Sequence, residues 1–241
     1  MSDQIEMPID TTTMTRVGGQ LGSNCAGIYE DNNGQRYYVK ELESPILAKN
    51  EWIAAQLYQL AGAPTLTYIP TVNSNQVATR WEKLDKQSLA QFSDDERRQA
   101  QQWFAVHAWM ANWDAVGLHG DNQGVLNGHV ITIDVGGALL FRAYGDPKGK
   151  AFGNDVYEII TLRTNQDNRR AYDLFGSMSK LQLIDALSRV SRLSDDAIIH
   201  TIQQHGGSDK LAIKMVNRKH SITTQLTTLM QHSNDDLINK I

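Results

Sequence analysis

Three polar residues in the second half of the chain, Asp114, Asn122 and Asp134, have the side-chain types that phosphoryl transfer requires. Transfer to a hydroxyl needs a carboxylate that accepts or orients the hydroxyl proton. It also needs an amide oxygen and a second carboxylate that hold Mg²⁺ on the phosphates. Asp134 follows an apolar, strand-like stretch at 131–133 and precedes Val-Gly-Gly. Each residue alone is also a common turn residue, so the hypothesis depends on the three together.

Lys40 and Glu51 in the first half would complete such a site. Lys40 lies in an alternating stretch typical of a strand, and Glu51 follows eleven residues later in a helical pattern. A lysine that reaches phosphates from a strand needs a carboxylate to hold its extended side chain, and a glutamate on the adjacent helix is the usual partner. Either residue alone is typical of a protein surface, so it is their order along the chain that indicates a shared role.

A glycine-rich stretch at residues 18–24 precedes this pair and contains Gly18, Gly19 and Gly22. It lies between two expected strands, whereas Rossmann and Walker A loops need a helix directly after the glycines. A β-hairpin that covers phosphates with backbone N–H groups is one interpretation. A purely structural turn is the other.

The elements expected to position these residues change from strands to helices near Lys86. The Asn33-Gly34 turn predicts a hairpin, and Pro45 and Gly62 bracket a helical pattern. We expect strands at 14–21, 26–30, 35–41, 64–70, 75–84, 125–126 and 130–133, and later helices at 155–162, 180–192, 194–204 and 208–231.

A capping-box pattern at Ser93–Glu96 predicts one long helix through Met110. The expected fold class is α+β, with two lobes. Residues 1–86 would form a small antiparallel β-rich lobe with one helix, and residues 87–241 a larger, mainly α-helical lobe.

Composition excludes several classes of protein. The chain has 241 residues, of which 41% are hydrophobic, and a formal net charge of −4, so the basic footprint of a nucleic-acid-binding protein is absent. Its apolar runs are far shorter than the ~18–20 residues of a membrane span. Residues 1–16 lack the pattern of a Sec signal peptide. Cys25 is the single cysteine, which favours a reducing cytosol, either the cell's own or a host's.

Several short stretches together resemble one family. They are Gly22-Ser23-Asn24, Tyr37-Tyr38-Val39-Lys40, Asn50-Glu51, Leu57–Gly62, Asn112-Trp113-Asp114, Asp121-Asn122 and Ile133–Ala143. As a set they resemble the bacterial atypical Ser/Thr kinases related to HipA and CtkA. Actin-fragmin kinase and minimal effector kinases are more distantly similar. The match runs from about Val17 to Leu162.

The resemblance implies a two-lobed, protein-kinase-like fold that binds ATP and Mg²⁺ and phosphorylates Ser or Thr of a protein substrate. Asp114, in a catalytic loop at 112–124, would be the catalytic base. Lys40 would touch the α- and β-phosphates, braced by Glu51, and Asn122 and Asp134 would be the metal ligands. The nucleotide contacts would be Gly18, Gly19, Gly22, Ser23, Asn24, Lys40, Arg80, Trp81 and Glu82, the last three from an inter-lobe hinge near 77–84.

The sequence departs from ordinary protein kinases in its catalytic loop. Seven residues separate Asp114 from Asn122, where protein kinases have about four. Asp121 is therefore a rival for the catalytic base. No His-Arg-Asp, Asp-Phe-Gly or Ala-Pro-Glu motif is present, and Asp134-Val135-Gly136 replaces the second of these.

The resulting hypothesis is a protein Ser/Thr kinase that acts in the cytoplasm or as a bacterial effector or toxin in a host cytosol. It would not bind nucleic acid, and it would not span a membrane. In HipA-like kinases a loop serine is autophosphorylated, so Ser23 would be a candidate self-phosphorylation site. The alternatives are a nucleotide-binding pseudokinase that serves as an interaction module, and the same fold acting on a small molecule or transferring AMP.

Overall fold

The computed structural model describes residues 7–21 and 24–238, with side chains up to residue 231. The strands are β1 (Thr15–Gly18), β2 (Ala26–Glu30), β3 (Arg36–Glu41), β4 (Tyr68–Ile69), β5 (Gln76–Arg80), β6 (Gln123–Leu126) and β7 (His129–Thr132). The α-helices are α1 (Pro45–Leu60), α2 (Asp94–Gln101), α3 (Phe104–Trp109), α4 (Glu158–Thr164), α5 (Arg169–Phe175), α6 (Lys180–Ser191), α7 (Asp195–Gln204) and α8 (Asp209–Ile238).

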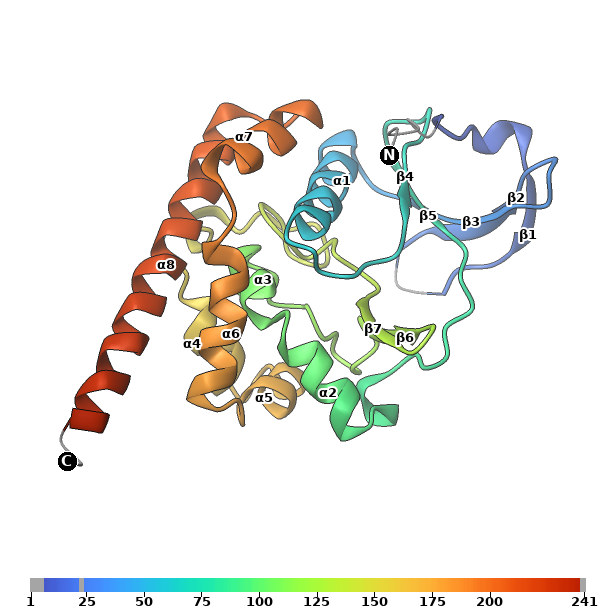
Figure 1. The fold of residues 1–241 in the computed structure, drawn as a ribbon. Helices are drawn as coiled ribbons and strands as arrows, with labels where there is room; N and C mark the ends of the chain where they lie inside the picture. Colours follow the sequence, from blue (N-terminus) through green and yellow to red (C-terminus); the bar gives the residue numbers. More distant parts are fainter. Residues whose placement is uncertain (1–6, 22–23, 239–241) are drawn as a thin grey trace.

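The first five strands form one antiparallel sheet in the order β1-β2-β3-β5-β4. In the middle of this sheet Lys40 on β3 is in register with Ala26 on β2 and with Val77 on β5. The sheet lies at one side of the molecule and the helices at the other (Figure 1). The predicted two-lobed α+β fold is confirmed.

Helix α1 lies between the sheet and the other helices (Figure 1). Pro45 occupies its first turn, where the missing N–H needs no partner, and Gly62 follows its end with a φ of +73°. Tyr58 of α1 accepts a buried hydrogen bond from Asn112, 3.0 Å away, and Asn50 donates one to the backbone of Ala138 at 2.9 Å. The helix is therefore tied to the segments that carry the predicted catalytic residues.

The prediction of one long helix after Ser93 was wrong. The capping box between Ser93 and Glu96 is present, but the helix ends at Gln101, and α3 begins at Phe104. The two short helices differ in burial: only Ala100 and Gln101 of α2 are buried, whereas all six residues of α3 are buried. A further short helix, α5, lies between the predicted helices and was not expected.

The predicted hairpin before Asp134 is present as β6 and β7, joined by a turn in which Asn127 and Gly128 both have positive φ. The hairpin packs beneath the sheet (Figure 1), and the N–H of Thr132 donates to the carbonyl of Pro64. Because β7 ends at Thr132, Asp134 emerges close to the sheet that carries Lys40. Within the described residues, no helix has the length and apolarity of a membrane span.

Candidate active site

Lys40 lies between two carboxylates that come from distant parts of the chain. Its Nζ is 2.9 Å from Glu51 Oε1 on α1 and 2.8 Å from Asp134 Oδ2 after β7. The side chains of Lys40 and Glu51 are 13% and 3% exposed, whereas that of Asp134 is 33% exposed. The structure thus brings together the lysine, the helix glutamate and the aspartate that the sequence singled out.

Burial and charge act in opposite directions in this cluster. Burial disfavours the charged form of Lys40, but Asp134 and Glu51 outweigh burial and hold its pKa above the ordinary value. Burial raises the pKa of Glu51, and Asp134 adds to this effect, although Lys40 and the Tyr68 hydroxyl stabilise the ionised form. Burial also opposes ionisation of Asp134, but Lys40 and the N–H of Gly136 hold its pKa below the usual range. Asp134 is therefore the ionised, partly accessible carboxylate of the cluster.

Tyr68 on β4 was not predicted to take part in the site. Its hydroxyl donates to Glu51 Oε1 at 3.1 Å. This hydrogen bond adds to the one from Lys40 and fixes the buried carboxylate. A single tyrosine in a two-residue strand carries no sequence pattern that would indicate such a contact.

Gly136 and Gly137, which follow Asp134, leave no room for side chains, because a Cβ at either position would lie too close to residues of the site. A Cβ on Gly136 would lie 2.8 Å from Glu51 Oε2, and a Cβ on Gly137 would lie 3.2 Å from the Cβ of Asp114. Glycine lets the backbone after Asp134 pass close to both carboxylates.

Asp114 and Asn122 are hydrogen-bonded to each other despite the long loop between them. Asn122 Nδ2 donates to the backbone oxygen of Asp114 at 2.7 Å and to its Oδ2 at 3.0 Å. The extra residues form a turn in which Gly117 and Gly120 have φ near +80°. The N–H of Asn122 donates to the carbonyl of Val116, so the loop folds back and does not separate the two side chains.

Asp114 differs from Asp134 in its electrostatics. Burial raises the pKa of Asp114 to about 6, the negative charge of Asp134 and, more weakly, that of Asp121 act in the same direction, and the hydrogen bond from Asn122 opposes them. Asp121 is exposed. The carboxylate of Asp114 is therefore poised to exchange a proton near neutral pH.

A cavity of about 320 Å³ lies against Lys40 and Asp134, on the sheet side of the site. Its lining includes Asn24, Lys40, Arg80, Trp81, Glu82, Asn122 and Asp134 from the predicted set, with Leu21, Leu66, Leu84 and Ile133 among its apolar members. The predicted hinge divides into two parts: 77–80 belongs to β5, and 81–84 leaves the sheet along the cavity. Among the described residues, no backbone hydrogen bond involves Glu82, Lys83 or Leu84.

The glycine-rich stretch is placed in part. Gly22 and Ser23 lie outside the described residues, and Asn24 lines the cavity. Of the part of this stretch that the structure describes, Gly18 and Gly19 line neither cavity of the site. A Cβ on Gly18 would lie 2.7 Å from Ile28 Cδ1, so glycine there permits the close approach of β1 to β2 at an irregularity in their pairing.

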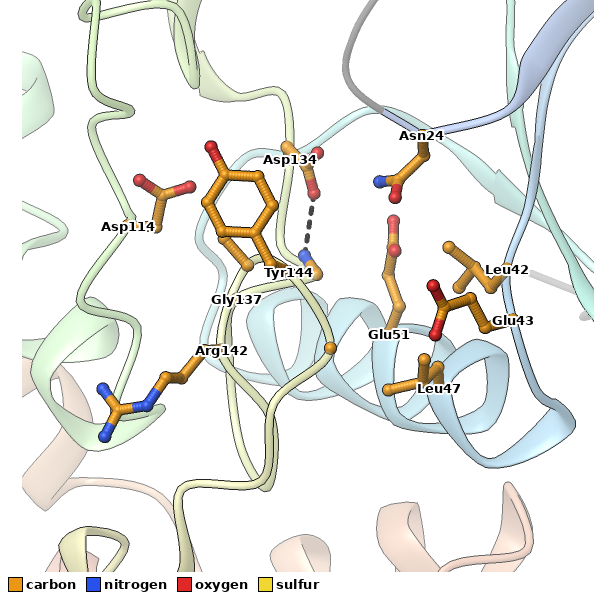
Figure 2. Close-up of a pocket in the computed structure, with 13 residues that line it drawn as sticks. Asn24, Leu42, Glu43, Leu47, Glu51, Asp114, Asp134, Gly137, Arg142 and Tyr144 are labelled. Atoms are coloured by element: carbon orange, nitrogen blue, oxygen red, sulfur yellow. Dashed lines mark hydrogen bonds between the residues drawn. The ribbon is translucent and has the colours of Figure 1, made fainter.

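A second, smaller cavity of about 70 Å³ also borders Asp134 (Figure 2). Asp114, Asp134, Gly137 and Tyr144 line it, together with Glu43 and Leu47 near the start of α1. Tyr144 was not predicted to belong to the site. It is 78% exposed and lies on the loop after Phe141, next to Asp114 and Asp134, whereas the guanidinium of Arg142 points away from them (Figure 2).

The side chains present fit a magnesium ion. Asn122 uses its Nδ2 on Asp114, which leaves its Oδ1 for another partner, and Asp134 is ionised and partly exposed beside it in the same cavity. Carboxylate and amide oxygens are the ligands that Mg²⁺ takes, with water and substrate phosphates completing its shell. In the described part of the chain, no group of three or more His, Cys, Asp or Glu side chains forms a metal site. These two side chains therefore suit a metal ion that is bound jointly by the protein and by the phosphates of a substrate.

Comparison with known proteins gives a fold but no sequence family. No protein-family model matches the chain, and no curated protein matches it in sequence. Among solved structures, it is similar to the Helicobacter pylori proinflammatory kinase CtkA, with a TM-score of 0.62, 16% identity, and coverage of 93% of this chain and 99% of that one.

Aminoglycoside phosphotransferase from Alicyclobacillus acidocaldarius also matches, with a TM-score of 0.32, 13% identity, and coverage of 91% of this chain and 93% of that one. A type I macrolide 2'-phosphotransferase gives a TM-score of 0.41 and 13% identity, with coverage of 90% of this chain and 88% of that one. The likeness to CtkA shows that the chain has the protein-kinase-like fold.

Proposed function

We propose that this chain is an ATP- and Mg²⁺-dependent phosphotransferase that phosphorylates Ser or Thr side chains of a protein. The observation that carries the proposal is the position of Lys40, within 3 Å of both Glu51 and Asp134 and lining one cavity with Asn122. A lysine held in this way binds the phosphates of a nucleotide in kinases. The fold shared with CtkA, named a proinflammatory kinase, supports it.

In this proposal the larger cavity binds ATP. The apolar residues Leu66, Leu84 and Ile133 would contact the adenine, and the backbone groups of 82–84 would meet its polar edge. Leu21 and Asn24, which line this cavity, would lie near the phosphates, and Lys40 would bind them. Asn122 and Asp134 would hold Mg²⁺, which neutralises charge on the β- and γ-phosphates.

Asp114 is the proposed catalytic base. It would accept the proton of the acceptor hydroxyl while that oxygen forms a bond to the γ-phosphorus and the bond to the β-phosphate oxygen breaks, giving phosphoester and ADP. The hydrogen bonds from Asn122 orient Asp114, and burial, which raises its pKa to about 6, makes it a stronger proton acceptor than an exposed aspartate while it is still mostly ionised at neutral pH.

The smaller cavity favours a side chain as the acceptor. Pockets that enclose drug-sized molecules have volumes of roughly 300–1,000 Å³. The cavity beside Asp114 has about 70 Å³, which suits a hydroxymethyl group presented by a polypeptide. Phosphorylation of a small molecule instead of a polypeptide would contradict this part of the proposal.

The experiment is to incubate the protein with Mg²⁺ and ATP labelled on the γ- or the α-phosphate, in the presence of a Ser/Thr peptide library or a set of aminoglycosides. We expect γ-label in peptides, and none with Asp134→Ala. Transfer of the α-label would indicate AMP transfer. Label in aminoglycosides would indicate a small-molecule kinase, and nucleotide binding without transfer would indicate a pseudokinase.

Self-phosphorylation at Ser23 is tested on the same samples. Intact-mass measurement should show a gain of one phosphate in the wild type and none in Ser23→Ala. An unchanged gain in Ser23→Ala would place the modification elsewhere.

A further inference from the structure

The ammonium group of Lys148 contacts the two loops that carry the proposed catalytic residues. Its Nζ donates to the backbone oxygens of Ala111 at 2.7 Å, Gly137 at 2.8 Å and Leu139 at 2.9 Å. Ala111 lies three residues before Asp114. Gly137 and Leu139 lie three and five residues after Asp134. One buried cation, 8% exposed, therefore joins both loops.

Two of the three residues whose carbonyl groups bind Lys148 have an unusual backbone conformation. Ala111 and Leu139 have φ of +51° and +57°. Residues other than glycine rarely adopt a positive φ, and this backbone conformation persists only where the surrounding structure holds it. Apart from Asn127 in the β6–β7 turn, they are the only non-glycine residues with positive φ in the described part of the chain. The N–H of Leu139 also donates to the carbonyl of Met110 at 2.7 Å.

A lysine ammonium has three N–H donors, and the three carbonyls use all of them. Burial opposes the charge of Lys148 and lowers its pKa to about 7, whereas the three carbonyl oxygens favour the ammonium form. A buried cation of this kind is weak evidence for a contribution to stability, so the reason for its presence lies in what it positions.

We propose that Lys148 is a positioning residue that sets the spacing between Asp114 and Asp134 by holding the carbonyls of residues 111, 137 and 139 on one ammonium group. This inference rests on the proposed function, because the two aspartates are its base and its metal ligand. Lys148 touches no reacting group and acts through the backbone. Its own N–H donates to the carbonyl of Leu140, so it also closes the loop that carries Tyr144.

The first test compares Lys148→Met with Lys214→Met. Lys214 is a matched control because its Nζ also donates to a backbone carbonyl, that of Phe152 at 2.6 Å, and both lysines lie over the Phe152 ring, but Lys214 contacts neither loop. We expect kcat of Lys148→Met to fall on the order of 10- to 100-fold, the scale for small misplacements of reacting groups, with KM for ATP within about twofold. Lys214→Met should keep both values.

Equal kcat in the two variants would overturn the proposal. Should Lys148→Met not fold, Lys148→Arg serves instead. It keeps the charge but not the compact three-donor geometry, so we expect a smaller fall in kcat with unchanged KM for ATP. Wild-type kcat in Lys148→Arg would then count against the proposal.

The second test is independent of turnover. Amide hydrogen exchange should become faster in Lys148→Met at both 111–122 and 134–143, and in neither segment of Lys214→Met. If the wild type transfers no phosphate and exchange rises at both segments, the proposed function fails and the positioning role stands. If the wild type is active and exchange is unchanged, the positioning role fails and the function stands.

Discussion

Asp114 and Asp134 line the same small cavity, yet the fold gives them opposite properties. Asp134 has a lysine ammonium at 2.8 Å and a backbone N–H from Gly136, so its pKa is low. The carboxylate of Asp114 accepts a hydrogen bond only from Asn122 among the described residues, and burial raises its pKa to about 6. Two carboxylates whose pKa values are separated by their surroundings are typical of a site that divides binding from proton transfer. These properties support the proposal that Asp134 binds the cation and that Asp114 accepts the proton.

The largest expected effect follows removal of the proton acceptor. Asp114→Asn keeps the shape of the side chain but cannot take a proton, so turnover should fall by about 10²- to 10⁴-fold. ATP affinity, measured by calorimetry, should stay within about twofold because Asp114 does not line the larger cavity. Asp121→Asn is the matched control. If Asp121→Asn lost turnover and Asp114→Asn kept it, the roles of the two aspartates would be exchanged.

The next effect concerns the buried ion pair between Lys40 and Glu51. Glu51→Ala leaves Lys40 with one carboxylate and Tyr68 without its acceptor in a buried site. We expect a loss of about 3 kcal/mol in the free energy of unfolding, measured with urea. Glu30→Ala breaks the pair with Arg36, in which the Glu30 side chain is 30% and the Arg36 side chain 53% exposed, and it should lose at most about 1 kcal/mol. Equal losses would show that the Lys40 cluster is not buried in solution.

The pH dependence of kcat/KM tests whether Asp114, and not Asp134, titrates near neutral pH. A base with a raised pKa is active only when deprotonated, so kcat/KM should fall as the pH drops through about 6. Asp121→Asn removes a negative charge that raises the pKa of Asp114, and the acid limb should move to lower pH. Asp146→Asn changes the net charge equally without acting on Asp114 and should leave the limb in place. A limb that moves equally in both variants would mean that Asp114 does not set it.

The smallest expected effect belongs to Tyr68. Tyr68→Phe removes one hydrogen bond from Glu51, which retains Lys40. Stability should fall by about 1 kcal/mol in urea unfolding, with turnover changed by less than about threefold. A loss of turnover as large as that of Asp114→Asn would show that Tyr68 does more than support Glu51.

Local periodicity and turn residues predicted most of the sheet and α1. The meeting of Lys40 with Glu51 was predicted from the order of a glycine-rich loop, a strand lysine and a helix glutamate along the chain, which kinases share. These signals lie within a few residues of the side chains that they position.

Contacts between distant segments were not predictable. The break between α2 and α3 depends on burial of α3 under other helices, and no local residue marks it. Lys148 reads as an ordinary surface lysine after Pro147 until the fold places three carbonyls around it. The positive φ of Ala111 and Leu139 has no sequence signal either, because turn-forming glycine or asparagine is absent at both positions.

The most direct test of the central claim is a crystal structure of the protein with Mg²⁺ and a non-hydrolysable ATP analogue. We expect the adenine beside residues 81–84, Lys40 on the phosphates, and Mg²⁺ at about 2.0–2.1 Å from oxygens of Asn122 and Asp134. A nucleotide bound away from Lys40, or a metal ion that touches neither Asn122 nor Asp134, would contradict it.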